Sequence, residues 1–198
     1  MTLAEIRAEV ESRGYDYISD SRLNLWIKQG YRWVCALEPW PFLETTVTGA
    51  APLTISDLSQ VLHVSYEDNT LRGADYRDIR DMDPGLDDTG DPVMWYLEGD
   101  TIKTWPDSTE TLTVRYVRKP PELSSDSSTP LLPDAHHPLL VDYAVMAGLK
   151  DNDEYDQAQG LRAVIDAQVQ DLRDQILVRN YQNPQQIVQT RHPDDYIA

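Results

Sequence analysis

The stretch from Ser19 to Glu44 limits the possible folds more than any other part of the chain. Its apolar residues recur every three or four positions, which is the spacing of one face of an α-helix. Pro39 and Pro41 lack the N–H group that would continue a helix, so we expect this one to end before Pro39. Its apolar stripe consists of Leu23, Trp26, Ile27, Gly30, Trp33, Val34 and Leu37.

Three further segments have helical periodicity, namely Leu3–Arg13, Asp134–Lys150 and Glu154–Asn180. The first begins with a capping-box pattern, because Thr2 and Glu5 are three residues apart. The segment Asp134–Lys150 is apolar on almost every side, which favours a central position in a bundle or a place in a subunit interface. On the predicted helices we expect five side chains to belong to the core or to an interface: Trp26, Trp33, Leu139, Leu140 and Tyr143.

From residue 43 the spacing of apolar residues changes to two, which is typical of β-strands. Turn sequences such as Asp68-Asn69 and Gly99-Asp100 separate the segments, and a short helix is expected from Ala74 to Met82. The predicted fold class is therefore α+β: a helical bundle of about four helices with an inserted antiparallel β-module. The expected parts are the bundle at 1–42 and 134–180, the β-module at 43–117, a linker at 118–133 and an extended C-terminal arm at 181–198.

The net charge of the chain is −17, and residues 43–117 hold most of the excess, with 5 basic and 15 acidic residues. Such a field repels phosphate groups, which argues against tight or sequence-specific binding of nucleic acid but permits DNA to slide past. The chain has no apolar run of about 18 residues and no signal-peptide pattern at its start, so no contact with a membrane is expected. The single cysteine, Cys35, excludes an internal disulfide and is expected to be a buried, unreactive thiol.

The motifs of common catalytic and cofactor sites are absent from the sequence, so we predict no enzymatic activity, no cofactor and no metal. Asp81 and Asp83 resemble the start of a calcium loop, but the Gly and Glu positions of an EF-hand are not met, which favours a solvated acidic loop. His136 and His137 are adjacent on a helix and point about 100° apart, so a shared metal is disfavoured and packing at the helix start is expected.

Several short motifs follow one another over residues 1–180. They include Gly14-Tyr15, the pattern Arg-Leu-x-x-Trp-Ile at 22–27, Pro-Trp-Pro-Phe-Leu-Glu at 39–44, Gly-Asp-Pro at 90–92, and His-His-Pro-Leu-Leu at 136–140. In this layout the chain resembles the head-to-tail adaptor (connector) proteins of tailed bacteriophages. The resemblance implies a structural virion protein that is made in the cytoplasm of the host bacterium and is located in the neck of the particle.

The resemblance also implies the partners. These are further copies of the chain in a ring of twelve subunits, a portal protein above the ring, tail or neck proteins attached to it, and double-stranded DNA that passes through the channel without specific binding. It implies that the C-terminal arm contacts the portal, through Tyr181, Ile187, Val188, Tyr196 and Ile197. Two alternatives stay open: another neck or tail-completion protein, and a carboxylate-rich protein that binds a metal or a carbohydrate.

Overall fold

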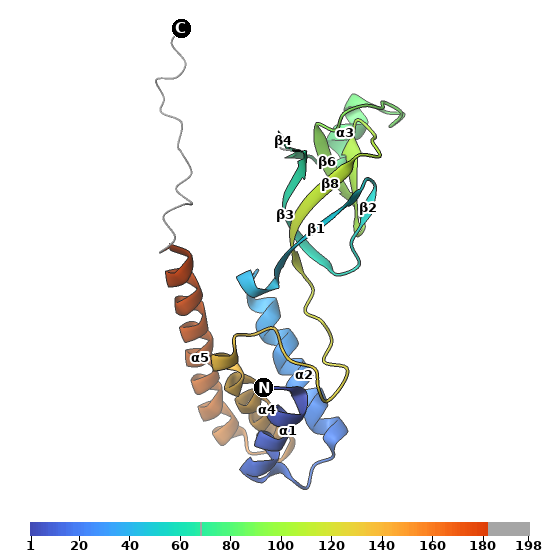
Figure 1. The fold of residues 1–198 in the computed structure, drawn as a ribbon. Coiled ribbons are helices and arrows are strands. Elements are labelled where there is room, and N and C mark those ends of the chain that lie inside the picture. The colour runs from blue at the N-terminus through green and yellow to red at the C-terminus, as the bar shows by residue number, and fades with distance from the viewer. Residues whose placement is uncertain (68, 182–198) are drawn as a thin grey trace.

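The computed structural model describes residues 1–67 and 69–181. The molecule is elongated, with helices at one end and strands at the other (Figure 1). The helical end contains α1 (Leu3–Val10), α2 (Asp20–Leu37), α4 (Pro138–Asp151) and α5 (Tyr155–Tyr181), whereas α3 (Tyr76–Met82) lies among the strands. The predicted α+β class is confirmed.

Helix α1 begins as the sequence predicts. The hydroxyl oxygen of Thr2 accepts a hydrogen bond from the Glu5 N–H (3.3 Å), and the Thr2 N–H donates to the Glu5 carboxylate (2.8 Å), which completes the capping box. The α-helix ends at Val10, earlier than predicted, and a π-helical segment, η1 (Glu11–Tyr15), continues it. Gly14 has a φ of +97°, a backbone conformation that glycine adopts without strain, so the chain turns there as expected.

Most of the predicted stripe of α2 is buried in the helical core, but its last turn differs. Leu37 is 37% exposed and Trp33 is half-buried, whereas Tyr31 and Cys35, on a neighbouring face, are buried. That face is covered because the chain after the last strand runs across it, where the Leu131 N–H donates to the Tyr31 hydroxyl (3.3 Å). The sequence pattern of a single helix cannot show such a second covered side.

Gly30, which belongs to the apolar stripe of α2, permits α2 and α4 to pack closely. A Cβ atom built on Gly30 would lie 2.8 Å from both Cγ and Cδ1 of Tyr143 in α4. Real Cβ atoms almost never approach other carbon atoms so closely, because the repulsion at that separation is steep. Glycine is therefore required here by the space available and not by the backbone angle.

The strands form two four-stranded sheets. Their order is β1-β8-β3-β4 in the first sheet and β2-β7-β6-β5 in the second. The short η2 (Pro41–Leu43) leads from α2 into β1, and η3 (Asp134–His136) precedes α4. The strands are β1 (Glu44–Ala50), β2 (Leu53–Thr54), β3 (Leu58–Tyr66), β4 (Asn69–Thr70), β5 (Arg72–Gly73), β6 (Met94–Glu98), β7 (Thr101–Trp105) and β8 (Thr111–Arg118).

The prediction of a purely antiparallel β-module is wrong in one place, because β5 pairs with β6 in parallel. The residues after the predicted Asp68-Asn69 turn are compatible with one strand, but the chain changes sheets at Leu71, between β4 and β5. The Leu71 N–H still donates to the Val64 carbonyl (2.9 Å), and the side chain is buried between the sheets. Burial of Leu71 therefore holds the crossing point, after which β5 joins the second sheet. The Gly99-Asp100 turn agrees with the prediction, since Glu98 pairs with Thr101 across it.

The connection from β8 back to the helices packs on the helical end. Leu123 and Leu132 are buried in the same core as α1, α2 and α4, and Val117 at the end of β8 joins that core. The carbonyl groups of Asp126 and Ser128 accept hydrogen bonds from N–H groups in the first turn of α1 (3.1 and 2.8 Å). Proline- and serine-rich sequence therefore does not make this segment a free linker, because its few leucines anchor it.

Candidate interaction surfaces

Helix α4 lies at the centre of the helical end. Leu139, Leu140 and Ala144 are at most 1% exposed, and Trp26 of α2 (5% exposed) belongs to the same core. Helices α1, α2 and α5 all pack against α4. The apolar surface that covers most of this helix is thus used within the chain, and three of the five side chains expected in a core or interface lie in this core.

The other two side chains, Trp33 and Tyr143, form a half-buried stack between α2 and α4. Their ring centroids are 5.5 Å apart, with the planes inclined by 27°. Arg162 of α5 covers the outer face of Trp33, with its guanidinium carbon 4.6 Å from the ring centroid. Such cation–π and stacking contacts are each worth about 1 kcal/mol, so the cluster ties the three helices together at the surface of the molecule.

Asp142 of α4 is a buried carboxylate with two partners. It accepts hydrogen bonds from Arg13 Nη1 (2.5 Å) and from Gln168 Nε2 (2.7 Å), and its residue is 7% exposed. Arg13 belongs to η1 and Gln168 to α5, so one carboxylate joins both elements to α4. Because its charge is paired with Arg13, this group stabilises the arrangement of the helices instead of offering a free acid for chemistry.

A groove of about 320 Å³ lies where the helical end meets the strands. The end of α2 and the end of β8 line it, and its basic side chains are Arg32, Arg118 and Lys119. Arg32 pairs with Glu122 (2.5 Å) and Lys119 with Asp100 (3.7 Å). The Arg118 Nε atom is buried, and no hydrogen-bond partner for it occurs among residues 1–67 and 69–181. Three basic side chains and the carboxylate of Glu38 therefore line this junction, and two of the basic groups are paired with acidic neighbours.

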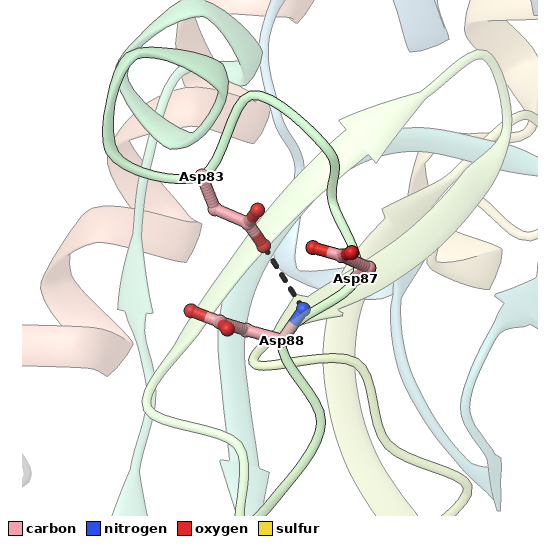
Figure 2. A group of neighbouring side chains, drawn as sticks. All are labelled: Asp83, Asp87 and Asp88. Carbon is pink, nitrogen blue, oxygen red and sulfur yellow. Dashed lines mark hydrogen bonds between the residues drawn. The ribbon is translucent and has the colours of Figure 1, made fainter.

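An acidic cluster lies at the opposite end of the β part, in the loop that follows α3. Carboxylate oxygens of Asp83, Asp87 and Asp88 lie within 4.8 Å of one another, and Figure 2 shows the three side chains around the loop. Asp83, at 6% exposure, accepts hydrogen bonds from the Asp88 N–H and from the Trp105 indole N–H, both at 3.2 Å. Burial raises the pKa of Asp83, but these hydrogen bonds and others from the loop backbone outweigh it and lower the pKa overall.

This geometry gives Asp83 a role in holding the loop. In the sequence, Asp83 and Asp81 resembled the start of a calcium loop. In the structure, Asp83 lies instead beside Asp87 and Asp88, because the loop folds back over Trp105. One Asp83 oxygen is already occupied by two donors, whereas Asp87 and Asp88 are exposed. The cluster thus places exposed negative charge at the far end of the β part.

The two adjacent histidines point to different partners. His137 is fully buried, with Nε2 2.9 Å from the Leu132 carbonyl and Nδ1 2.6 Å from the amino nitrogen of Met1. The Nε2 atom of His136 lies 3.2 Å from the Gln175 amide oxygen of α5. Both rings therefore pack the start of α4 against neighbouring segments, which is the role the sequence suggested.

The C-terminal arm falls almost entirely outside the described residues. Tyr181 is the last residue of α5, one position beyond the predicted end of that helix. Ile187, Val188, Tyr196 and Ile197 belong to residues 182–198, outside the part of the chain that the structure describes. In the described ranges, none of the helices has a stretch that is both long and apolar enough to cross a bilayer.

Two features of these surfaces were not predicted. Arg162 showed no signal in the sequence, because its contact with Trp33 depends on how α5 packs beside α2. The basic groove did have a visible signal, since Arg118-Lys119 ends an alternating segment directly before Pro120-Pro121 in an acidic chain. Adjacent basic residues where a strand ends can reach into the junction between two parts of a fold.

Comparison with known proteins gives one clear result. A family model described as SU10 adaptor protein matches residues 1–196. A search of curated proteins finds no match for the chain. The family match extends over both the helical and the strand-bearing part, and over almost the entire length of the sequence.

Proposed function

Since this chain belongs to the SU10 adaptor protein family, we propose that it is a head-to-tail adaptor that forms a ring of twelve copies beneath the portal. Membership makes the chain a structural bacteriophage protein and a component of the virion. In the proposed assembly the ring extends the DNA channel and offers a platform for tail or neck proteins. The family match along residues 1–196 is the observation that carries this proposal.

The two-part shape supports an adaptor role. Residues 1–42 and 134–180 would form the ring-building core, and residues 43–117 would project from it as a separate β-module. An elongated subunit with different surfaces at its two ends can contact one partner above a ring and another below it (Figure 1). Joining two unlike structures is the task of an adaptor.

The charges of the surface fit a channel protein. Residues 43–117 carry 15 acidic and 5 basic residues, and the cluster around Asp87 and Asp88 exposes part of this charge. DNA near such a surface is repelled, so it passes without being held. The junction groove with Arg118 and Lys119 is a basic exception and is suited to an acidic protein partner.

Residues 181–198 would form the arm that reaches the portal. The segment leaves the end of α5, and α5 is held to the end of α2 by the Arg173–Glu38 ion pair (2.5 Å). The arm therefore starts close to the junction of the two parts. Its apolar residues Tyr196 and Ile197 would bury surface on the portal, which is the main driving force of most protein contacts.

The test is reconstitution with portal-bearing heads. We expect electron microscopy to show a ring of twelve copies bound below the portal, and native mass spectrometry to give the same stoichiometry. A variant that lacks residues 185–198 should melt at the same temperature as the full chain and fail to join the heads. A full chain that binds isolated tails but never a portal would contradict the proposal and favour a tail-completion role.

A further inference from the structure

Strand β1 is an edge strand without the usual protection against further pairing. It stands at the end of its sheet and pairs with β8 in an unbroken register from Glu44 to Ala50. From Thr45 to Ala50 the strand has no charged residue and no proline. Edge strands of natural proteins are commonly protected by charges, prolines or bulges, because an open edge is a template for another strand.

Three hydrogen bonds show which backbone groups of β1 face outward. The Leu71 N–H donates to the Val64 carbonyl, so the backbone groups of Val64 point away from β8. Val64 lies opposite Val114 of β8, and the two residues do not exchange backbone hydrogen bonds because the groups of Val64 point away. The N–H and C=O groups of Val114 therefore face β1, where they bond to Val47. The Ser65 hydroxyl donates to the Thr113 carbonyl, so Thr113, next to Val114, faces β3. The Ala51 N–H donates to the Glu110 carbonyl, so residue 51 faces the β8 side, as Val47 does. Both bonds agree with backbone groups that face opposite sides at successive residues.

The outward groups of β1 therefore belong to Thr46, Thr48 and Ala50. Each presents one N–H and one C=O on the free edge, and all three residues are exposed. Outside the pairing with β8, no backbone hydrogen bond to them occurs within the described ranges. The edge thus offers the alternating donors and acceptors that an added strand requires.

The opposite edge of the same sheet is protected. Strand β3 pairs irregularly with β8, with register shifts between Leu58 and Gln60 and between Val61 and His63. Its last residues, Ser65 and Tyr66, are covered by β4. Bulges and a short covering strand are recognised means of blocking further pairing, so the contrast makes β1 the edge that is left open.

The sequence beyond α5 contains one segment suited to this edge. Residues 185–190 read Gln-Gln-Ile-Val-Gln-Thr, with no charge and with three β-branched residues. Pro184 and Pro193 bound the region in which a strand can form. Only residues 182–184 separate the segment from the end of α5, and they span at most roughly 10 Å.

We propose that residues 185–190 of a second copy of this chain add as a strand to the free edge of β1. The inference rests on the proposed ring, in which neighbouring copies are related by rotation and place their junctions at the same height. A segment donated from one copy to the edge of the next is a head-to-tail contact, which closes into a ring. Ile187 and Val188 then link copies, and Tyr196 and Ile197 remain further along the arm for the portal.

The first test uses a labelled peptide of residues 182–193 and the full-length protein with Ile187→Pro and Val188→Pro. Adjacent residues of a strand face opposite sides, so one of the two prolines removes an N–H toward β1, and the protein's own segment can no longer add as a strand. We expect saturable binding of the peptide. Thr46→Pro removes an outward N–H without touching the bonds to β8, and should weaken binding about tenfold or more. Thr46→Val keeps the N–H and should bind as before.

Two results would overturn the inference in this assay. One is no binding of the peptide, and the other is equal binding by the Thr46→Pro and Thr46→Val proteins. A peptide that carries both Ile187→Pro and Val188→Pro serves as a control that leaves the protein unchanged, and it should not bind. If Thr46→Pro lowers the melting temperature strongly, this second peptide still decides the question.

The second test asks whether the strand comes from another copy. A full chain with Thr46→Cys and Val188→Cys is oxidised on the portal and run on a denaturing gel without reductant. A ladder of cross-linked multimers supports the proposal, whereas a monomer with an internal cross-link, or no cross-link in a ring seen by microscopy, contradicts it. Failure of the wild-type chain to form any ring would instead refute the proposed function.

Discussion

Replacing Gly30 by alanine sets two opposite effects against each other. Alanine is favoured over glycine within a helix by about 1 kcal/mol, so an exposed site would be stabilised. At Gly30, however, the new Cβ would lie 2.8 Å from the root of the Tyr143 ring. That ring cannot easily retreat because it stacks on Trp33, with centroids 5.5 Å apart. Overpacking of this kind costs about 1–3 kcal/mol, which exceeds the helix gain.

We therefore expect Gly30→Ala to lower the free energy of unfolding by about 1 kcal/mol, or the melting temperature by about 2–4 °C. Urea denaturation followed by circular dichroism measures the first quantity. In a Tyr143→Ala background the two ring carbons at 2.8 Å are gone and only the Cβ atom of residue 143, at 3.1 Å, remains near the new Cβ. The same Gly30→Ala change should therefore cost at least about 1 kcal/mol less there than in the wild-type chain. The destabilisation by Gly30→Ala should thus shrink once the ring is removed.

Gly160→Ala in α5 is the matched control, since nothing lies within 4 Å of the Cβ it would add. It should stabilise the chain by about 1 kcal/mol in either background. If Gly30→Ala stabilises the wild-type chain as Gly160→Ala does, the close approach of α2 and α4 is not as described, and the reasoning fails.

Three further outcomes follow from buried groups. Asp142→Ala should lower the free energy of unfolding by about 2 kcal/mol in urea, because Arg13 and Gln168 lose their shared acceptor; a change below about 0.5 kcal/mol would show that the carboxylate holds nothing. Burial lowers the pKa of His137 in the folded chain. As the pH falls, this histidine is therefore protonated in the unfolded chain at a higher pH than in the folded chain. Unfolding free energy should therefore fall as the pH drops from about 7.5 through 6.5, and this slope should shrink in His137→Asn. Burial raises the pKa of Cys35 to about 12, partly offset by its hydrogen bond with Tyr31, so a thiol reagent at about pH 8 should label the folded chain at least a hundredfold more slowly than the urea-unfolded chain. Equal labelling rates would place the thiol at the surface.

The helices were predictable because each has its own local signals. The capping box at Thr2 and Glu5, the stripe of α2 and the proline stop after it act within a few residues, and the structure shows them where the sequence indicated. The Gly99-Asp100 turn between β6 and β7 is of the same kind. The order of helix, strand and helix blocks was enough to predict the α+β class.

Features that join distant residues were not predictable in this way. The pattern of Thr70 to Arg72 was compatible with one strand, and only the burial of Leu71 between two sheets divides it into β4 and β5. Leu37 fits the apolar period of α2 yet is 37% exposed, because none of the described segments covers the last turn on that side. The stack of Trp33, Tyr143 and Arg162 forms only when α2, α4 and α5 pack side by side at the right positions along their axes.

The sequence by itself determined the fold class, the start of α1 and the end of α2, the excess of negative charge and the resemblance that the family match confirms. These depend on periodicity, capping and composition, which are properties of neighbouring residues. Only the tertiary structure decided which acidic groups gather, which basic side chains meet Arg118 at the junction, and that β1 is an edge strand among the described residues. Those depend on residues far apart in the chain, whose contacts arise only when the helices and sheets pack.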